Sequence, residues 1–455
     1  MALGRRRREE QELWVATTEL PKSPGHVFYG KLNALLAEAD FDRFVEELCR
    51  EFYADAVGRP GIPPGVYFRM LLVGYFEGIG SQRGIAWRCS DSLSLREFLG
   101  LSATEESADH SSLTRVRERL PLEVHAAVFQ FVLNIAAQKK LLKGKAVAVD
   151  ATTLEANAAM KSIVRRDTGE DWNEYLRRLM LEEGLIEELD EPTDEELRRF
   201  DKQRKNKTVS NEQWVSTTDP DSRITKMKDG TTHLAYKAEH VVDLETDLVV
   251  GVEVYQADQA DTDTLVDSVM QAQVHLEAAG VEERIEEVAA DKGYHADETL
   301  ELAESLCLRT YIPEPKRHQK RRWTDKPPEY QRAVYNNRRR TRRDKGRRMQ
   351  RTRSELVERT FAHLCETGGG RRTWLRGLMK VNKRWLIHAA ARNLGLILRK
   401  LFGIGTARSL QTAGGLALRV QIPCLIALLS HRCHPSSAAL YGRSHTVDRQ
   451  LVIAV

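Results

Sequence analysis

The chain has 455 residues, of which 41% are hydrophobic and 30% charged, so it can bury a core and is long enough for two to four domains. No apolar stretch approaches the ~18 residues of a transmembrane helix, and no apolar segment follows the arginines near residue 5, as it would in a secretory signal. The six cysteines form no C-x-x-C pair, which argues against a disulfide framework or a zinc knuckle. We therefore expect a cytoplasmic protein that does not enter a membrane.

Positive charge is concentrated in one segment, although the formal net charge of the whole chain is only +4. Residues 316–353 hold 17 Lys and Arg against three acidic residues, a net charge of +14, so the rest of the chain carries −10. A chain with this distribution is suited to meet a polyanion along one surface.

Residues 1–140 are predicted to form an all-α domain with helix-turn-helix-like units, because apolar residues recur at helical spacing between about residues 21 and 139. Asp109 is expected to cap a helix that carries Arg115, Arg117 and Arg119, and this helix is the candidate DNA-facing one. A plain helical domain with a solvated basic face is the alternative, and it is the more common outcome for such a pattern.

Residues 141–411 alternate between strand and helix patterns. A short buried strand is predicted to end at Asp150, and the charged insertion at about 161–230 shows no strand pattern, so we expect it to be helical or partly disordered. Further strands are predicted at 233–242, 248–255, 285–290 and 308–312, and helices at 263–279, 297–306, 355–365 and 381–402. This is the element order of a ribonuclease H-like α/β fold, a mixed sheet with flanking helices.

Three acidic residues are candidates for one shared site. Asp150 ends the first strand, Asp291 follows the strand at 285–290, and Glu358 lies on a helix beside its buried stripe. The two strands are neighbours in a ribonuclease H-like sheet, so the two aspartates are expected to converge. Glu355 is the alternative third acid. Gathered carboxylates repel one another unless cations neutralise them, and their hard oxygens suit two Mg²⁺ or Mn²⁺ ions acting at a phosphodiester.

Five stretches carry a family resemblance: PPGVYFRMLLVGYFEGIGSQRGIAWRCSDSLSLREFLG at 63–100, AVDATTLEANA at 148–158, ITKMKDGTTHLAYKAEHVVD at 224–243, VAADKGYH at 288–295 and LVERTFAHL at 356–364. Over about residues 13–411 the chain resembles the DDE transposases of bacterial insertion sequences. The resemblance implies that Asp150, Asp291 and Glu358 are the metal-binding catalytic triad, and that the N-terminal domain binds the terminal inverted repeats of the element. It also implies cleavage and strand transfer on double-stranded DNA by a nucleoid-associated homodimer that holds both ends.

Basic and aromatic side chains outside the triad are predicted to contact DNA. The basic segment is expected to supply sequence-independent phosphate contacts. The candidates there and beside Glu358 are Arg338, Arg339, Arg340, Arg342, Arg343, Arg353 and Arg359. Lys292 and Tyr294 are candidates for the scissile phosphate, unless Gly293 simply makes a turn and Tyr294 packs. Trp323 and Tyr335 either stack on unpaired bases or anchor a loop to the core.

Two features depart from the family pattern. Related transposases often carry a lysine about two helical turns after the glutamate, and here that neighbourhood holds Cys365. Residues 412–455 contain no lysine and no glutamate, so we interpret them as an atypical, disordered or read-through tail. These departures keep two alternatives open: an inactive relic that acts as a DNA-binding repressor, and a ribonuclease H-like nuclease without strand transfer.

Overall fold

The computed structural model describes residues 16, 25–54, 61–102, 104–205, 209–227, 230–316, 321–404 and 406–407, and these residues belong to one compact unit. The atypical tail predicted at 412–455 lies outside the described residues.

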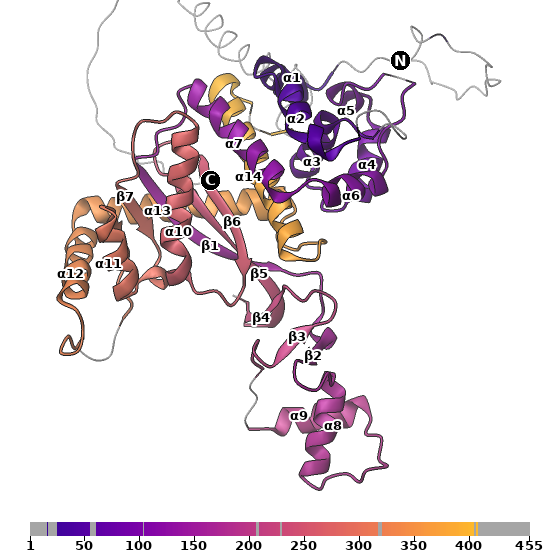
Figure 1. Ribbon diagram of the computed structural model, residues 1–455, viewed down its shortest axis with the longest axis vertical. Helices are drawn as coiled ribbons and strands as arrows, with labels where there is room; N and C mark the ends of the chain where they lie inside the picture. The colour runs from indigo at the N-terminus through magenta and orange to yellow at the C-terminus, as the bar shows by residue number, and fades with distance from the viewer. Residues whose placement is uncertain are drawn as a thin grey trace, which may run out of the picture. The chain divides into compact units, whose positions relative to one another are not determined.

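The first part of the described chain is all-helical, as predicted (Figure 1). Its helices are α1 (Val27–Glu38), α2 (Phe41–Cys49), α3 (Pro64–Glu77), α4 (Gln82–Asp91), α5 (Leu93–Phe98), α6 (His110–Arg119) and α7 (Leu122–Gln138), with a short 3-10 turn η1 (Arg50–Phe52) after α2. Asp109 caps α6 as expected, because its Oδ1 accepts a hydrogen bond from the Ser112 N–H at 2.6 Å. α7 then packs along the last described helix, α14 (Leu378–Phe402), so the helical region shares a core with the α/β region.

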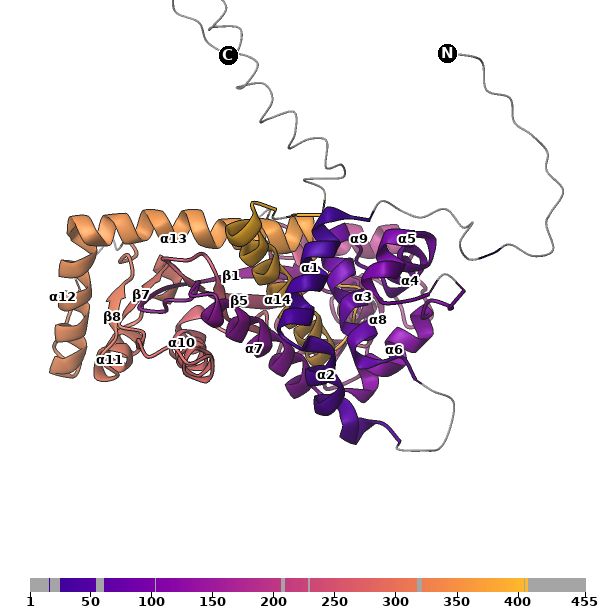
Figure 2. The same ribbon diagram turned by 90° about the horizontal axis from the view of Figure 1, so that it is seen from above.

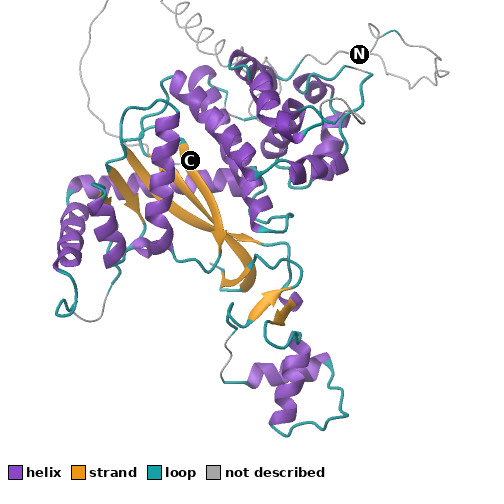
Figure 3. Cartoon of the chain, viewed as in Figure 1, coloured by secondary structure: helices purple, strands orange, loops and turns teal. Residues whose placement is uncertain are grey.

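One six-stranded mixed sheet follows (Figure 3). Its strands are β1 (Ala146–Glu155), β4 (Arg223–Lys226), β5 (Thr232–Asp243), β6 (Val249–Gln256), β7 (Glu287–Ala290) and β8 (Arg309–Tyr311). β5 pairs antiparallel with β1, β4 and β6, whereas β7 pairs parallel with β1 and β8. This order and these directions confirm the predicted ribonuclease H-like fold.

Helices cover both faces of this sheet (Figure 2). They are α10 (Asp261–Ala278), α11 (Asp297–Ser305), α12 (Pro328–Arg342), α13 (Asp344–Ala362) and α14, with a 3-10 turn η3 (Lys292–Tyr294) after β7 and a π-helical turn η4 (His363–Thr367) after α13. Successive β5 side chains point to opposite faces. Glu239 accepts a hydrogen bond from Ser268 of α10, and His240 bonds Thr360 of α13 and Trp385 of α14.

β1 is longer than predicted, and this changes the place of Asp150. The strand runs on to Glu155, because residues 151–155 pair with residues 235–239 of β5. Asp150 therefore lies in the middle of β1 and not at its end. The sequence Asp-Ala-Thr-Thr lacks an apolar alternation, so only the pairing with β5 reveals the extension.

The charged insertion contains strands as well as helices, so the expectation of no sheet there is wrong. β2 (Ile163–Arg165) and β3 (Trp214–Ser216) form a two-stranded sheet, and β4 joins the main sheet. A 3-10 turn η2 (Met160–Ser162) precedes β2 and helices α8 (Trp172–Glu182) and α9 (Asp194–Gln203) follow it. Three or four residues are too few to show a strand period, and these strands form only because a partner lies beside them.

Among the described helices, none is by itself long and apolar enough to cross a membrane. α6 and α7 pass that test only as a pair, and they are bent by 96° relative to each other.

Candidate active site

Asp150 and Asp291 lie side by side on neighbouring strands. β1 and β7 are parallel and their register pairs Val149 with Ala290, so the next residue of each chain is an aspartate. Neighbouring strands are about 4.8 Å apart, which brings the two backbones together at this edge of the sheet. The register thus places the two residues beside each other along the backbone, and the convergence of their carboxylates stays a prediction.

Asp150 is partly exposed and is paired with an arginine. Its side chain is 26% exposed and lies on the face of the sheet that α13 crosses, because its cross-strand neighbour is His240. Oδ1 accepts a hydrogen bond from the Ala151 N–H at 2.9 Å, and Oδ2 accepts one from Arg353 Nη1 at 2.7 Å. The Arg353 side chain is only 11% exposed, so it pairs with this carboxylate and does not lie on an open surface where DNA could contact it.

Asp291 begins the η3 turn, and a third aspartate lies near it. Asp291 Oδ1 accepts a hydrogen bond from the Gly293 N–H. A Cβ on Gly293 would lie 3.1 Å from Asp291 Oδ1 and 2.8 Å from Asp261 Oδ2, so the two carboxylates face the same small space. Asp261 was not among the site residues predicted from the sequence. The available signal was an acid in the first turn of the helix that follows β6.

Glu239 is a buried carboxylate on β5, opposite Ala151 of β1. Its oxygens accept hydrogen bonds from three hydroxyl groups, those of Thr264, Ser268 and Tyr294. Burial raises the pKa of Glu239 above its usual range, although these hydrogen bonds and nearby Lys237 oppose the shift. Burial also raises the pKa of Tyr294, with Glu239 and Asp261 adding to the effect.

Tyr294 is therefore a packed residue and not a DNA contact. It is fully buried and donates its hydroxyl proton to Glu239 Oε2 at 2.8 Å. Lys292, two residues earlier, is exposed beside Asp291 and stays a candidate for phosphate contact. Of the two alternatives for this turn, the structure favours a packed tyrosine with an exposed lysine.

The structure does not bring Glu358 to the two aspartates. Glu358 is exposed on α13, five residues after Arg353, which at about 100° per residue places the two side chains about 140° apart around the helix. Glu355 is also exposed and pairs with Arg359. Within the described ranges, no three His, Cys, Asp or Glu side chains form a group that could hold a metal ion. The choice between Glu358 and Glu355 as third acid stays a prediction.

The three arginines of α6 do not share one environment. Arg115 and Arg119 are exposed, whereas Arg117 is 9% exposed and turns into the protein. Burial lowers the pKa of Arg117 below its usual range. Arg117 therefore does not lie on the exposed face of α6 with Arg115 and Arg119, because alternate positions on a helix point to different sides.

The arginines of the basic segment divide in the same way. Arg339, Arg342 and Arg343 are exposed on α12 and just after it. Arg338 donates two hydrogen bonds to Glu314, both at 2.8 Å, and Arg340 donates to the Thr310 carbonyl at 3.1 Å. These two arginines attach α12 to the end of β8. Further exposed arginines that the sequence analysis did not single out are Arg347, Arg348 and Arg351 of α13.

Other predicted contact residues are held by the protein itself. Arg359 is partly exposed and pairs with Glu355 and, at 3.5 Å, with Asp247. The rings of Trp323 and Tyr335 lie 5.9 Å apart, with the Arg321 guanidinium 4.8 Å from the Trp323 ring centre. This arrangement favours the alternative in which the two aromatic residues anchor a loop.

Two family models match this chain. Residues 19–119 match a transposase domain of the type designated DUF772, and residues 143–394 match the transposase DDE domain. No curated protein and no solved structure matched the chain. The second match spans the six-stranded sheet and its helices as far as residue 394 within α14, includes Asp150, Asp291 and Glu358, and covers more than half of the sequence. The chain therefore belongs to the DDE transposase family.

Proposed function

We propose that this protein is the transposase of an insertion sequence, which binds the terminal inverted repeats of its element, cuts the DNA strand and joins the freed 3′ end to target DNA. The observation that carries the proposal is the juxtaposition of Asp150 and Asp291 on β1 and β7 of a ribonuclease H-like sheet. Transposase family membership supports the same reaction class.

The residues at this edge fit a divalent cation. Asp150 and Asp291 offer hard carboxylate oxygens, the ligand type that Mg²⁺ and Mn²⁺ prefer, and Asp261 lies near Asp291. Since the described acids do not gather into a three-ligand group here, the proposal requires them to move closer together around the ion. Such ions, two by our proposal, supply Lewis-acid stabilisation of the charge that develops at phosphorus. The protein's own part is to hold Asp150 and Asp291 on rigid strands and to release Asp150 from Arg353. Glu358 is proposed as a third ligand, which requires α13 to present a different side from the one seen here.

DNA binding is proposed to rest on exposed arginines of two regions. Arg115 and Arg119 of α6 are candidates for contacts to the element ends, and Arg339, Arg342 and Arg343 are candidates for phosphate contacts. A homodimer that holds both ends follows from the need to process two ends together.

The test is strand cleavage and joining on a labelled duplex that carries the element's end, with Mg²⁺ or Mn²⁺. We expect a metal-dependent joined product from the wild type, reduced at least a hundredfold by Asp150→Asn and Asp291→Asn. Cleavage without joining would favour a nuclease. Binding without any cleavage by the wild type would favour the relic and would overturn the catalytic assignment.

The third acid is tested with a matched pair on the same helix. Glu358→Gln is expected to abolish joining, while Glu355→Gln is expected to retain it. The two variants are matched, because each change removes one exposed charge of α13. The reverse result would assign the role to Glu355. Full activity of both variants would exclude both glutamates and make Asp261 the candidate for the third acid.

A further inference from the structure

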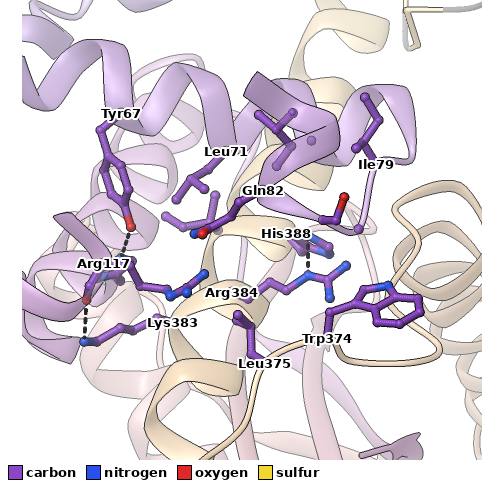
Figure 4. Close-up of a pocket in the computed structure, with 16 residues that line it drawn as sticks. Tyr67, Leu71, Ile79, Gln82, Arg117, Trp374, Leu375, Lys383, Arg384 and His388 are labelled. Carbon is purple, nitrogen blue, oxygen red and sulfur yellow. Dashed lines mark hydrogen bonds between the residues drawn. The ribbon is translucent and has the colours of Figure 1, made fainter. Parts of the chain in front are cut away.

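A cavity of about 260 Å³ lies between the helical region and α14 (Figure 4). Its walls come from α3, α4, α6, α7, the segment before α14 and α14 itself. Leu71, Ile85 and Ile387 supply apolar walls, and Trp374, which is 53% exposed, also lines it. None of the acids discussed above lines this cavity, so it is distinct from the candidate active site.

Three cationic side chains line the cavity: Arg117 of α6, and Lys383 and Arg384 of α14. No carboxylate of a described residue forms an ion pair with any of them; the nearby Glu118 pairs with Lys380 instead. Lys383 donates a hydrogen bond to the backbone carbonyl of Arg117 at 3.1 Å, which attaches α14 to α6. Burying several like charges without a counter-charge is unfavourable, so binding of an anion in this cavity would be favourable.

Four nitrogen donors of the cavity-lining residues have no hydrogen-bond partner among the described residues. They are Gln82 Nε2, Arg117 Nε, Arg384 Nη1 and His388 Nδ1. His388 is a donor at Nδ1 because its Nε2 already accepts a hydrogen bond from Arg384 Nε at 3.3 Å. Burial holds the pKa of His388 well below its usual range, so the ring is neutral with its proton on Nδ1.

Burial also lowers the pKa of Arg384, to about 10, so this guanidinium stays charged near neutral pH. Its Nη2 donates to the Gly369 carbonyl at 2.9 Å, which leaves Nη1 for a ligand. Figure 4 shows Arg117, from α6, on one side of this space, and the Arg384 side chain, from α14, running toward His388 and Trp374. Donors contributed by several elements suit an oxyanion with acceptors in several directions.

We propose that this cavity binds a phosphate group, held by Arg117, Lys383 and Arg384, and that the bound phosphate fastens α6 to α14. A tetrahedral oxyanion offers enough acceptors for the four donors, whereas a planar carboxylate offers fewer directions. The phosphate comes either from a DNA backbone or from a free phosphate ester. The cavity thus connects the helical region to the ribonuclease H-like region through a ligand, independently of the cleavage chemistry.

The first experiment is thermal unfolding against inorganic phosphate, with chloride keeping the ionic strength constant. We expect the Tm of the wild type to rise with phosphate, because a ligand that binds only the folded state stabilises it. Arg384→Met is expected to raise the half-saturating phosphate concentration at least tenfold, the size of one charge-assisted hydrogen bond. The matched control is Arg43→Met, which removes an exposed arginine of α2 and should leave the response unchanged.

The Tm of Arg384→Met without phosphate distinguishes a loss of phosphate binding from misfolding. Without phosphate this variant should still fold, because it removes a buried charge that no carboxylate pairs, while it loses the hydrogen bonds to Gly369 and His388. Arg117→Met is the second variant and should lose the phosphate response as well. If the wild type shows no phosphate-dependent rise in Tm and both variants bind duplex DNA like the wild type, the proposal is overturned and the cavity holds water only.

Duplex binding distinguishes the two sources of phosphate, and Asp291→Asn protein removes cleavage from the measurement. If DNA supplies the group, phosphate will compete with a short duplex more strongly than chloride at equal ionic strength, and Arg384→Met will weaken duplex binding. If a free phosphate ester is the ligand, duplex binding will be unchanged while the rise in Tm remains. The readout does not depend on strand joining, so a failed cleavage assay leaves this test intact.

Discussion

At the residue scale, the ion pair between Asp150 and Arg353 affects how the candidate active site would bind a cation. Asp150, the proposed cation ligand, is held here by a guanidinium that occupies one of its oxygens. Cation binding at Asp150 must therefore compete with Arg353.

Arg353→Gln should tighten cation binding because it removes this competitor. We expect the Kd for Mn²⁺, measured by calorimetry without DNA, to fall by about three- to tenfold, the range for a partly exposed ion pair. Arg351→Gln, an exposed arginine of the same helix, is the control and should change the Kd little. Unchanged or weaker binding in Arg353→Gln would show that the arginine does not compete.

Glu239 makes the free energy of unfolding depend on pH. Its pKa is raised in the folded protein, so between its ordinary value of 4.5 and the raised value the folded state binds more protons than the unfolded state. The free energy of unfolding should therefore fall as pH increases through this window. The groups that face Glu239 are Lys237, Thr264, Ser268 and Tyr294.

Glu239→Gln mimics the protonated form and should flatten this fall, as measured by urea unfolding from pH 4.5 upward. The slope of unfolding free energy against pH should become less negative than in the wild type. An identical slope in both proteins would mean that Glu239 keeps its ordinary pKa.

At the element scale, α8 and α9 of the insertion form a small core of their own. Leu176, Met180, Leu197 and Phe200 are buried against one another, and each helix begins with a capping box, at Asp171 and Thr193. Local capping and local packing together hold this helix pair.

Leu176→Ala should therefore destabilise the insertion and leave the main sheet intact. We expect a loss of about 2–4 kcal/mol within the helix pair, the usual effect of deleting a buried leucine side chain. Hydrogen exchange should accelerate at residues 172–203 and stay unchanged in β1 and β5. Faster exchange throughout the sheet would show that the insertion shares the main core.

At the scale of the whole molecule, only some of the arginines in the basic segment at 316–353 are exposed at the protein surface. Arg338 and Arg340 fasten α12 to the rest of the protein, whereas Arg339, Arg342 and Arg343 remain exposed. The number of charges available to DNA is thus smaller than the net +14 of the segment suggests.

Neutralising the three exposed arginines together, as Arg339→Gln, Arg342→Gln and Arg343→Gln, should weaken duplex binding and flatten its salt dependence. Each released phosphate contact should change the slope of log K against log salt by about 0.9, so the triple variant should lose about 2.7. Arg338→Gln is the matched control, since that side chain is paired with Glu314. A slope as steep as that of the wild type would place the DNA elsewhere.

The order of elements was largely predictable from the sequence. The strands at β5, β6, β7 and β8 and the helices α10, α11 and α14 lie within a few residues of their predicted places. Their apolar alternation and helical stripes reflect burial on one or both faces, which the sequence records directly. The short strands β2, β3 and β4 and the end of β1 depend on partners far along the chain and could not be predicted locally.

The sequence by itself determined the fold class and the family, and it predicted the pair Asp150 and Asp291, because strand and helix patterns are local properties of the sequence. Only the tertiary structure decided which side chains face one another. It buried Arg117 and Tyr294, paired Arg353 with Asp150, brought Asp261 near Asp291 and left Glu358 exposed. The physical reason is that the side on which a helical residue lies, and the charge that it meets there, depend on packing between elements distant in sequence.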